Sequence, residues 1–66
     1  MNIRLKEIRE EKGMTQEQLE IKSGISRQTI SAIENGRTNN VMSGTLTALA
    51  DALDTTIDAI FFDKRV

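Results

Sequence analysis

Residues 16–36 constrain the fold of this chain more than any other stretch, because they read as two short helices joined by a tight turn. The turn falls at Ser23-Gly24-Ile25, where Gly24 can adopt the positive φ that a sharp reversal between helices requires. Apolar residues stand where two crossed helices must bury them, at Leu19, Ile25, Ile30 and Ile33. The chain has 66 residues, so little room remains beyond this pair and the elements that support it.

Capping signals place the boundaries of this pair. Thr15 and Gln18 form a capping-box pattern before the first helix, and Ser26 is a suitable N-cap for the second. Both starts are supported by apolar pairs that can form hydrophobic staples, Met14 with Leu19 and Ile25 with Ile30. Gly36, after Asn35, ends the second helix, so the motif spans residues 16–35.

Periodicity predicts three further helices. The first runs from about Ile3 to Lys12, with Gly13 as its stop. A fourth helix, capped by Ser43, carries a clean amphipathic stripe of Leu46, Leu49, Ala50 and Leu53. Thr55 or Thr56 caps a short fifth helix with Ile57, Ile60 and Phe61 as its apolar residues. We therefore expect an all-α fold, a compact five-helix domain occupying residues 1–66 without internal repeats or linkers.

Composition excludes several classes of function. The chain has no Cys and no His, which removes disulfides and the usual zinc sites, and we expect no metal and no cofactor. It also lacks Tyr and a phosphate-cradling glycine pattern, and the pair Glu10-Glu11 is explained by a solvated helix face. We therefore expect no catalytic residues and no enzyme. No apolar run reaches the roughly 20 residues of a membrane span, and no signal-peptide core is present, so we expect a cytoplasmic protein without membrane contact.

The outward face of the helix that follows Ser26 carries side chains suited to reading DNA. Arg27 can donate two hydrogen bonds to guanine, and the Gln28 amide can pair with adenine. Thr29 and Ser31 can contact a thymine methyl or a phosphate, although an ordinary solvated residue is the simpler explanation of each. A helix-turn-helix with such a face predicts double-stranded DNA as the partner.

Phosphate contacts are expected at helix N-termini, where free N–H groups and the helix dipole attract anions. Thr15 and Gln16 stand at one such end and Ser26 at the next, although Thr15 is also explained as an N-cap alone. The polar segment after the second helix of the motif is suited to contacting phosphates of the same DNA strand. Its candidate residues are Asn35, Arg37, Thr38 and Asn39. For Asn39 and Asn40 a plain turn explains the sequence equally well.

The charged residues of the chain support two further expectations, an ion pair and weak nonspecific binding to DNA. Arg9 and Glu34 each follow an inward-facing isoleucine, which predicts a partly buried ion pair between the first and third helices. The net charge is −1, with the basic residues concentrated slightly toward the first forty positions. DNA binders are usually basic, so we expect weak nonspecific binding and a strong reliance on direct contacts and dimerisation.

The sequence resembles lambda-repressor-like, Cro-type (XRE family) helix-turn-helix proteins over roughly residues 3 to 61. The matching patterns are Leu5-x-x-Ile8-Arg9, Gly13-Met14-Thr15-Gln16-x-x-Leu19, Ser23-Gly24-Ile25-Ser26-Arg27-Gln28-Thr29-Ile30-Ser31-x-Ile33-Glu34-Asn35-Gly36, Leu46-x-x-Leu49-Ala50-x-x-Leu53 and Ile57-Asp58-x-Ile60-Phe61. One departure is Glu20, which stands where the family commonly has Ala facing the helix crossing. Either this side chain turns outward or the crossing is looser.

The resemblance implies a bacterial or phage transcription regulator that binds DNA as a symmetric dimer. It also implies that Gln16 and Asn35 hold phosphates, that Arg27, Gln28 and Ser31 read bases, and that Arg9 pairs with Glu34. We expect a repressor acting as a homodimer on an inverted repeat, with dimer contacts drawn from Ile57, Ile60, Phe61 and Phe62. For Ile60 and Phe61, packing within the monomer is the favoured alternative. A second possibility is a protein-binding module, such as the antitoxin of a toxin–antitoxin pair or an adaptor.

Overall fold

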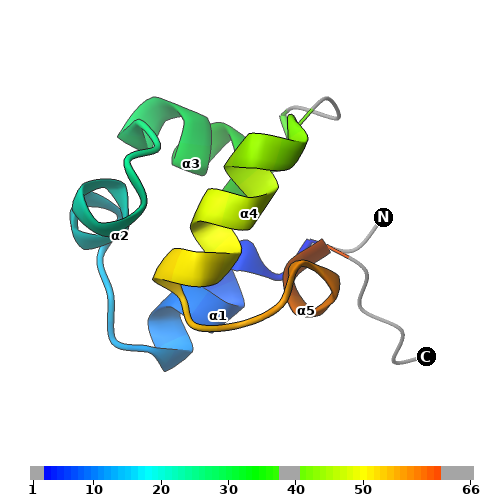
Figure 1. The fold of residues 1–66 in the computed structure, drawn as a ribbon. Helices are drawn as coiled ribbons and strands as arrows, with labels where there is room; N and C mark the ends of the chain where they lie inside the picture. The colour runs from blue at the N-terminus through cyan, green and yellow to red at the C-terminus, as the bar shows by residue number, and fades with distance from the viewer. Residues whose placement is uncertain (1–2, 38–40, 62–66) are drawn as a thin grey trace.

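Five helices make up the part of the chain that the structure describes, residues 3–37 and 41–61 of a computed structural model (Figure 1). They are α1 (Leu5–Glu11), α2 (Gln16–Ser23), α3 (Arg27–Glu34), α4 (Ser43–Ala52) and α5 (Ile57–Phe61). No strand occurs within these residues. The expected all-α fold with five helices is confirmed.

The start of α2 has the capping box that its sequence predicts. The Gln18 backbone N–H donates to the Thr15 hydroxyl at 3.1 Å, and the Thr15 backbone N–H donates to the Gln18 side-chain oxygen at 2.9 Å. These two bonds satisfy backbone donors that the first turn of a helix leaves free. The first residue of α2, Gln16, is thereby fixed close to the end of α1.

A three-residue turn joins α2 to α3. Gly24 takes the left-handed conformation with φ +77°, as expected, and its N–H donates to the Glu20 carbonyl. Ser26 caps α3 by accepting a hydrogen bond from the Thr29 N–H at 3.2 Å. Since the turn is so short, α2 and α3 pack against each other and the direction of α3 is set by α2.

The start of α4 differs from its prediction. Ser43 is the first helical residue, not the cap; the N-cap is Met42, whose side chain makes no capping hydrogen bond. Met42 has the extended backbone of an N-cap (φ −68°, ψ 147°), so geometry rather than side-chain chemistry places the helix boundary here. For α5 the expected cap is present, because the Ala59 N–H donates to the Thr56 hydroxyl at 3.1 Å.

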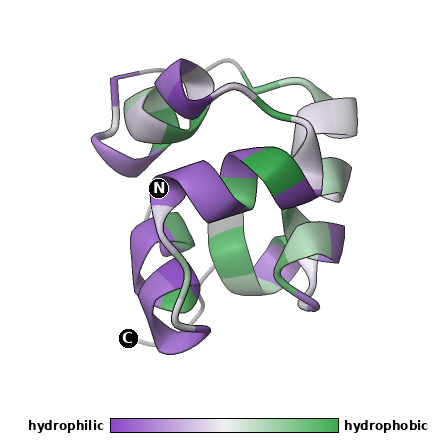
Figure 2. Cartoon of the chain, turned by 90° about the vertical axis from the view of Figure 1, so that its left-hand side faces the viewer, coloured by the Kyte–Doolittle hydropathy of each residue, from purple (hydrophilic) through white to green (hydrophobic). Residues whose placement is uncertain are grey.

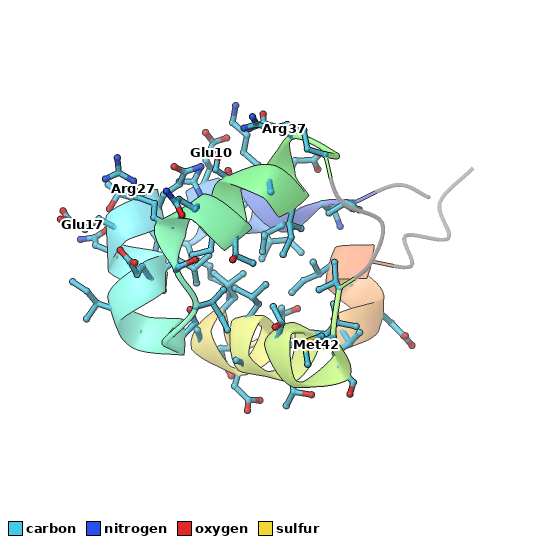
Figure 3. All side chains as sticks on the ribbon, turned by 90° about the horizontal axis from the view of Figure 1, so that it is seen from above. Glu10, Glu17, Arg27, Arg37 and Met42 are labelled. Atoms are coloured by element: carbon cyan, nitrogen blue, oxygen red, sulfur yellow. The ribbon has the colours of Figure 1, made fainter. Side chains whose placement is uncertain are left out.

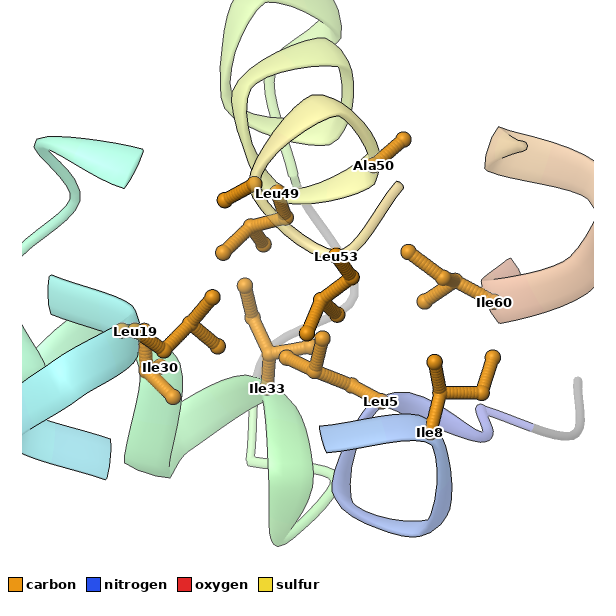
Figure 4. Packing of buried hydrophobic residues seen from close by; sticks show 10 residues of the cluster. Leu5, Ile8, Leu19, Ile30, Ile33, Leu49, Ala50, Leu53 and Ile60 are labelled. Atoms are coloured by element: carbon orange, nitrogen blue, oxygen red, sulfur yellow. The ribbon is translucent and has the colours of Figure 1, made fainter. Parts of the chain in front are cut away.

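One core holds the helices together (Figure 4). It lies among α1, α3, α4, α5 and the inner side of α2, and it consists of Leu5, Ile8, Leu19, Ile30, Ile33, Leu49, Ala50, Ala52, Leu53 and Ile60. Hydrophobic and hydrophilic residues are both found along the helices, as the hydropathy colouring shows (Figure 2). Within the described residues, no helix is both long enough and apolar enough to cross a membrane.

Candidate nucleic-acid interface

The first turn of α3 is open to solvent, and its side chains face away from the core. Arg27 and Gln28 are both exposed, and neither side chain makes a hydrogen bond within the described residues. Arg27 and Arg37 project from the same side of the molecule at opposite ends of α3, while α4 covers the other side (Figure 3). The arrangement leaves one face of α3 free to enter a groove.

The N-terminus of α2 lies beside this face. A surface depression brings Arg27 together with the end of α1 and the start of α2, and it is lined by Arg9, Glu10, Gly13, Met14, Thr15, Gln16, Glu17 and Arg27. The expected phosphate-contacting residues Thr15 and Gln16 therefore adjoin the expected base-contacting residue Arg27. Such proximity is compatible with the expected base contact and the expected phosphate contacts being made to one DNA strand.

A buried ion pair connects α1 to the end of α3 beside this depression. Arg9 Nε donates to Glu34 Oε2 at 2.7 Å and Arg9 Nη2 donates to Glu34 Oε1 at 3.2 Å, the pair that the sequence predicts. Arg9 Nη1 also donates to the Met14 carbonyl, and Gln16 Nε2 donates to Glu34 Oε1 at 3.0 Å. The hydrogen bond and charge of Glu34 raise the pKa of Arg9 against the lowering effect of burial, so Arg9 stays charged at every physiological pH.

This network has a consequence for Gln16. One of its two amide hydrogens is occupied by Glu34, which orients the side chain. The other hydrogen can still be donated to a ligand. Glu34 thus ties the end of α3, the first helix and the start of α2 into a single unit.

A separate cluster of polar side chains lies at the C-terminal end of α3. Asn35 Nδ2 donates to the Ser31 carbonyl at 2.9 Å and to Ser31 Oγ at 3.2 Å, and Arg37 Nη2 reaches Ser31 Oγ at 3.4 Å. Ser31 is half-buried and engaged as an acceptor, but its hydroxyl hydrogen can still be donated. The expected base contact Ser31 and the expected phosphate contacts Asn35 and Arg37 therefore form one cluster.

The hydroxyls of Ser26 and Thr29 are engaged in capping. Ser26 Oγ accepts from the Thr29 N–H and donates to Thr29 Oγ1 at 2.9 Å. Both residues are exposed on the face of α3. Of the polar segment after α3, Thr38 and Asn39 lie outside the described residues, so their phosphate contacts stay predictions.

Acidic side chains stand on the same face as Arg27, a placement that the sequence analysis did not predict. Glu10 and Glu17 project from the side that carries Arg27 (Figure 3) and line the same depression. Glu20 is half-buried, and its Oε2 accepts an exposed hydrogen bond from the Arg27 backbone N–H at 3.0 Å. The sequence signal for this contact was the departure at Glu20 itself.

The residues proposed for dimer contacts divide three ways. Ile60 is fully buried in the core of the monomer, which is the alternative that was favoured for it, and α5 packs there against α1 and α4. Ile57 is half-buried against the same core. Phe62 and the side chain of Phe61 lie outside the described residues.

Comparison with known proteins agrees with this geometry. The family described as Helix-turn-helix (HTH_3) matches residues 5–60. The chain therefore belongs to this family, and the resemblance to lambda-repressor-like helix-turn-helix proteins is confirmed.

Two similar proteins add detail. The chain is 50% identical over 46 residues to the uncharacterized HTH-type transcriptional regulator y4dJ of Sinorhizobium fredii (strain NBRC 101917 / NGR234). That match covers 70% of this chain and 58% of the relative, so the chain spans little more than half of its relative's length. A chain of the solved SinR protein/SinI protein complex has the same fold, with a TM-score of 0.87 and 27% identity, over 94% of this chain and 60% of that one.

Proposed function

We propose that this protein is a transcriptional regulator that binds double-stranded DNA in a sequence-specific manner. The observation that carries the proposal is the exposed first turn of α3, where Arg27 and Gln28 stand beside the N-terminus of α2. Arg27 can bond two acceptors of a guanine and Gln28 the edge of an adenine, while Gln16, Asn35 and Arg37 contact the backbone. The naming of the relative y4dJ as a transcriptional regulator supports the same role.

The finer mechanism is a homodimer acting as a repressor. Two copies place their α3 helices in successive major grooves, about 34 Å apart, on an inverted repeat. A net charge of −1 supports dimeric binding, because a single copy has little nonspecific attraction to DNA. Such a regulator works in the cytoplasm of a bacterium or of the host of a phage.

The test is a selection of genomic fragments with purified protein, followed by footprinting at near-physiological salt. Protection of an inverted repeat with half-sites about one helical turn apart is the expected result. Weak, salt-sensitive binding without sequence preference would contradict the proposal.

Two arginine variants separate base reading from phosphate binding on the selected site. Arg27→Ala should cost about 1–3 kcal/mol on that site and relax the preference at one base position. Arg37→Ala should weaken binding to all sequences alike and lower the salt dependence by about one counterion. Equal weakening of all sequences by both variants would make Arg27 a phosphate contact.

A protein-binding role is the second candidate. The solved structure with the same fold is a complex between two proteins, SinR and SinI, which shows that a protein of this fold has a protein partner. An antitoxin or adaptor would act through such a partner. Co-purification of one stoichiometric small protein, together with absence of sequence preference in the fragment selection, would favour this role.

A further inference from the structure

Glu20 connects the two helices of the motif in a way that capping rules alone do not require. Its carboxylate oxygen Oε2 accepts a hydrogen bond of 3.0 Å from the backbone N–H of Arg27, the first residue of α3. Ser26, the cap of α3, serves a different donor, the N–H of Thr29. The first turn of α3 is therefore held from two sides, by its own cap and by a side chain of α2.

The electrostatics of this contact are favourable. The first N–H groups of a helix have no partner inside the helix, and the helix dipole makes that end attractive to a negative charge. A carboxylate is thus a better acceptor there than a neutral group. The bond itself is exposed, so water competes for it and its net contribution is that of an ordinary hydrogen bond.

The geometry bears on base reading. Between Glu20 and Arg27 the chain reverses through the turn at Gly24, which is itself bonded to the Glu20 carbonyl. The backbone and the side chain of Glu20 therefore hold both sides of the turn. The residue anchored by the carboxylate is Arg27, whose side chain is free to reach a base.

We propose that Glu20 is a positioning residue for sequence readout. By holding the first amide of α3, it fixes the direction in which Arg27 and Gln28 leave the helix, which sharpens the discrimination between bases. The same bond keeps this amide from a phosphate, and the carboxylate lowers the affinity for any DNA by its charge. This inference rests on the proposed DNA-binding function of α3.

Three substitutions at Glu20 separate these effects. Glu20→Gln keeps an oxygen acceptor at the same reach but removes the charge. Glu20→Asp keeps the charge but is one methylene too short, and Glu20→Ala removes both. Glu17→Gln is the matched control, because it removes one charge from α2 at an exposed residue whose side chain makes no hydrogen bond within the described residues.

The readout is the ratio of dissociation constants for the selected duplex and a duplex altered at the base pair that Arg27 reads. Glu20→Asp and Glu20→Ala should lower this ratio about three- to tenfold, which corresponds to the net contribution of one ordinary hydrogen bond. Glu20→Gln and Glu17→Gln should bind both duplexes more tightly and leave the ratio within about twofold. In parallel, the Arg27 amide should exchange its hydrogen faster in the Asp and Ala variants.

Circular dichroism verifies that each variant folds. If Glu20→Ala does not fold, the ratio of dissociation constants for Glu20→Asp alone tests the role of Glu20. An unchanged ratio in Glu20→Asp and Glu20→Ala, with a wild-type protein that discriminates between the duplexes, would overturn the role of Glu20 alone. A wild-type protein that fails to discriminate would overturn the proposed function and this inference together.

Discussion

Removing the charge of Glu34 should nearly unfold the protein. The Glu34 side chain is 2% exposed and that of Arg9 is 9% exposed, and three side-chain hydrogen bonds converge on the Glu34 carboxylate. In Glu34→Gln the side chain keeps its size, so no cavity forms, but the Arg9 charge stays buried without its counter-charge, although its hydrogen bond to the Met14 carbonyl remains. Breaking a buried ion pair in this way costs about 3–5 kcal/mol. A domain of this size has a net stability of only about 3–5 kcal/mol, so the two quantities are comparable.

Urea denaturation followed by far-UV circular dichroism measures the loss. The matched control is Glu7→Gln, which breaks an exposed pair of similar length: Arg4 Nε lies 3.1 Å from Glu7 Oε2, and the Glu7 side chain is 63% exposed. Pairs of that kind contribute about 0–1 kcal/mol. Adding Arg9→Met to Glu34→Gln should recover part of the loss, because it removes the unpaired charge. A cost of Glu34→Gln no larger than that of Glu7→Gln would refute the reasoning.

Two substitutions at helix ends should instead stabilise the protein, as thermal melting would show. Asp54 follows α4 with a positive φ of 54°, a conformation that costs a residue with a side chain about 1–2 kcal/mol. Asp54→Gly removes this cost, partly offset by chain entropy, and should raise the melting temperature by about 2–4 °C. Met42 has N-cap geometry and is 76% exposed, so Met42→Ser should add about 0.5–1 kcal/mol without loss of packing. Lower melting temperatures would contradict both expectations.

Local chemistry made much of the fold predictable. The capping box at Thr15 and Gln18 involves residues only three positions apart, so its outcome hardly depends on the rest of the chain. The turn at Gly24 is similarly local, because it needs a positive φ that glycine adopts freely. Repeated apolar spacing indicated the core, and its members at Leu49 and Leu53 are buried as expected.

Features that depend on three-dimensional geometry were harder to predict. Ser43 has a side chain suited to capping a helix, yet it is the first residue of α4, so the helix begins one residue earlier than predicted. The extended backbone of an N-cap occurs at Met42 instead. Glu20 and Arg27 are seven residues apart and meet across a turn, a contact that neither helical periodicity nor capping rules contain. Ile60 was open to either a core or an interface role, since burial between α5 and the other helices does not follow from its own helix.

The candidate interface contains two kinds of side chain, and the difference bears on specificity. Gln16, Ser31 and Asn35 are held by hydrogen bonds within the protein, so little conformational freedom remains for DNA to remove. Arg27 and Gln28 have no such bonds within the described residues, and ordering each on DNA costs about 0.5–1.5 kcal/mol. Only a sequence that offers them matching acceptors offsets that cost. Because the chain has a net charge of −1, its nonspecific electrostatic attraction to DNA is weak and cannot compensate for DNA bases that do not match these side chains. Binding should therefore depend on the bases that these two side chains meet more than on the phosphates around them.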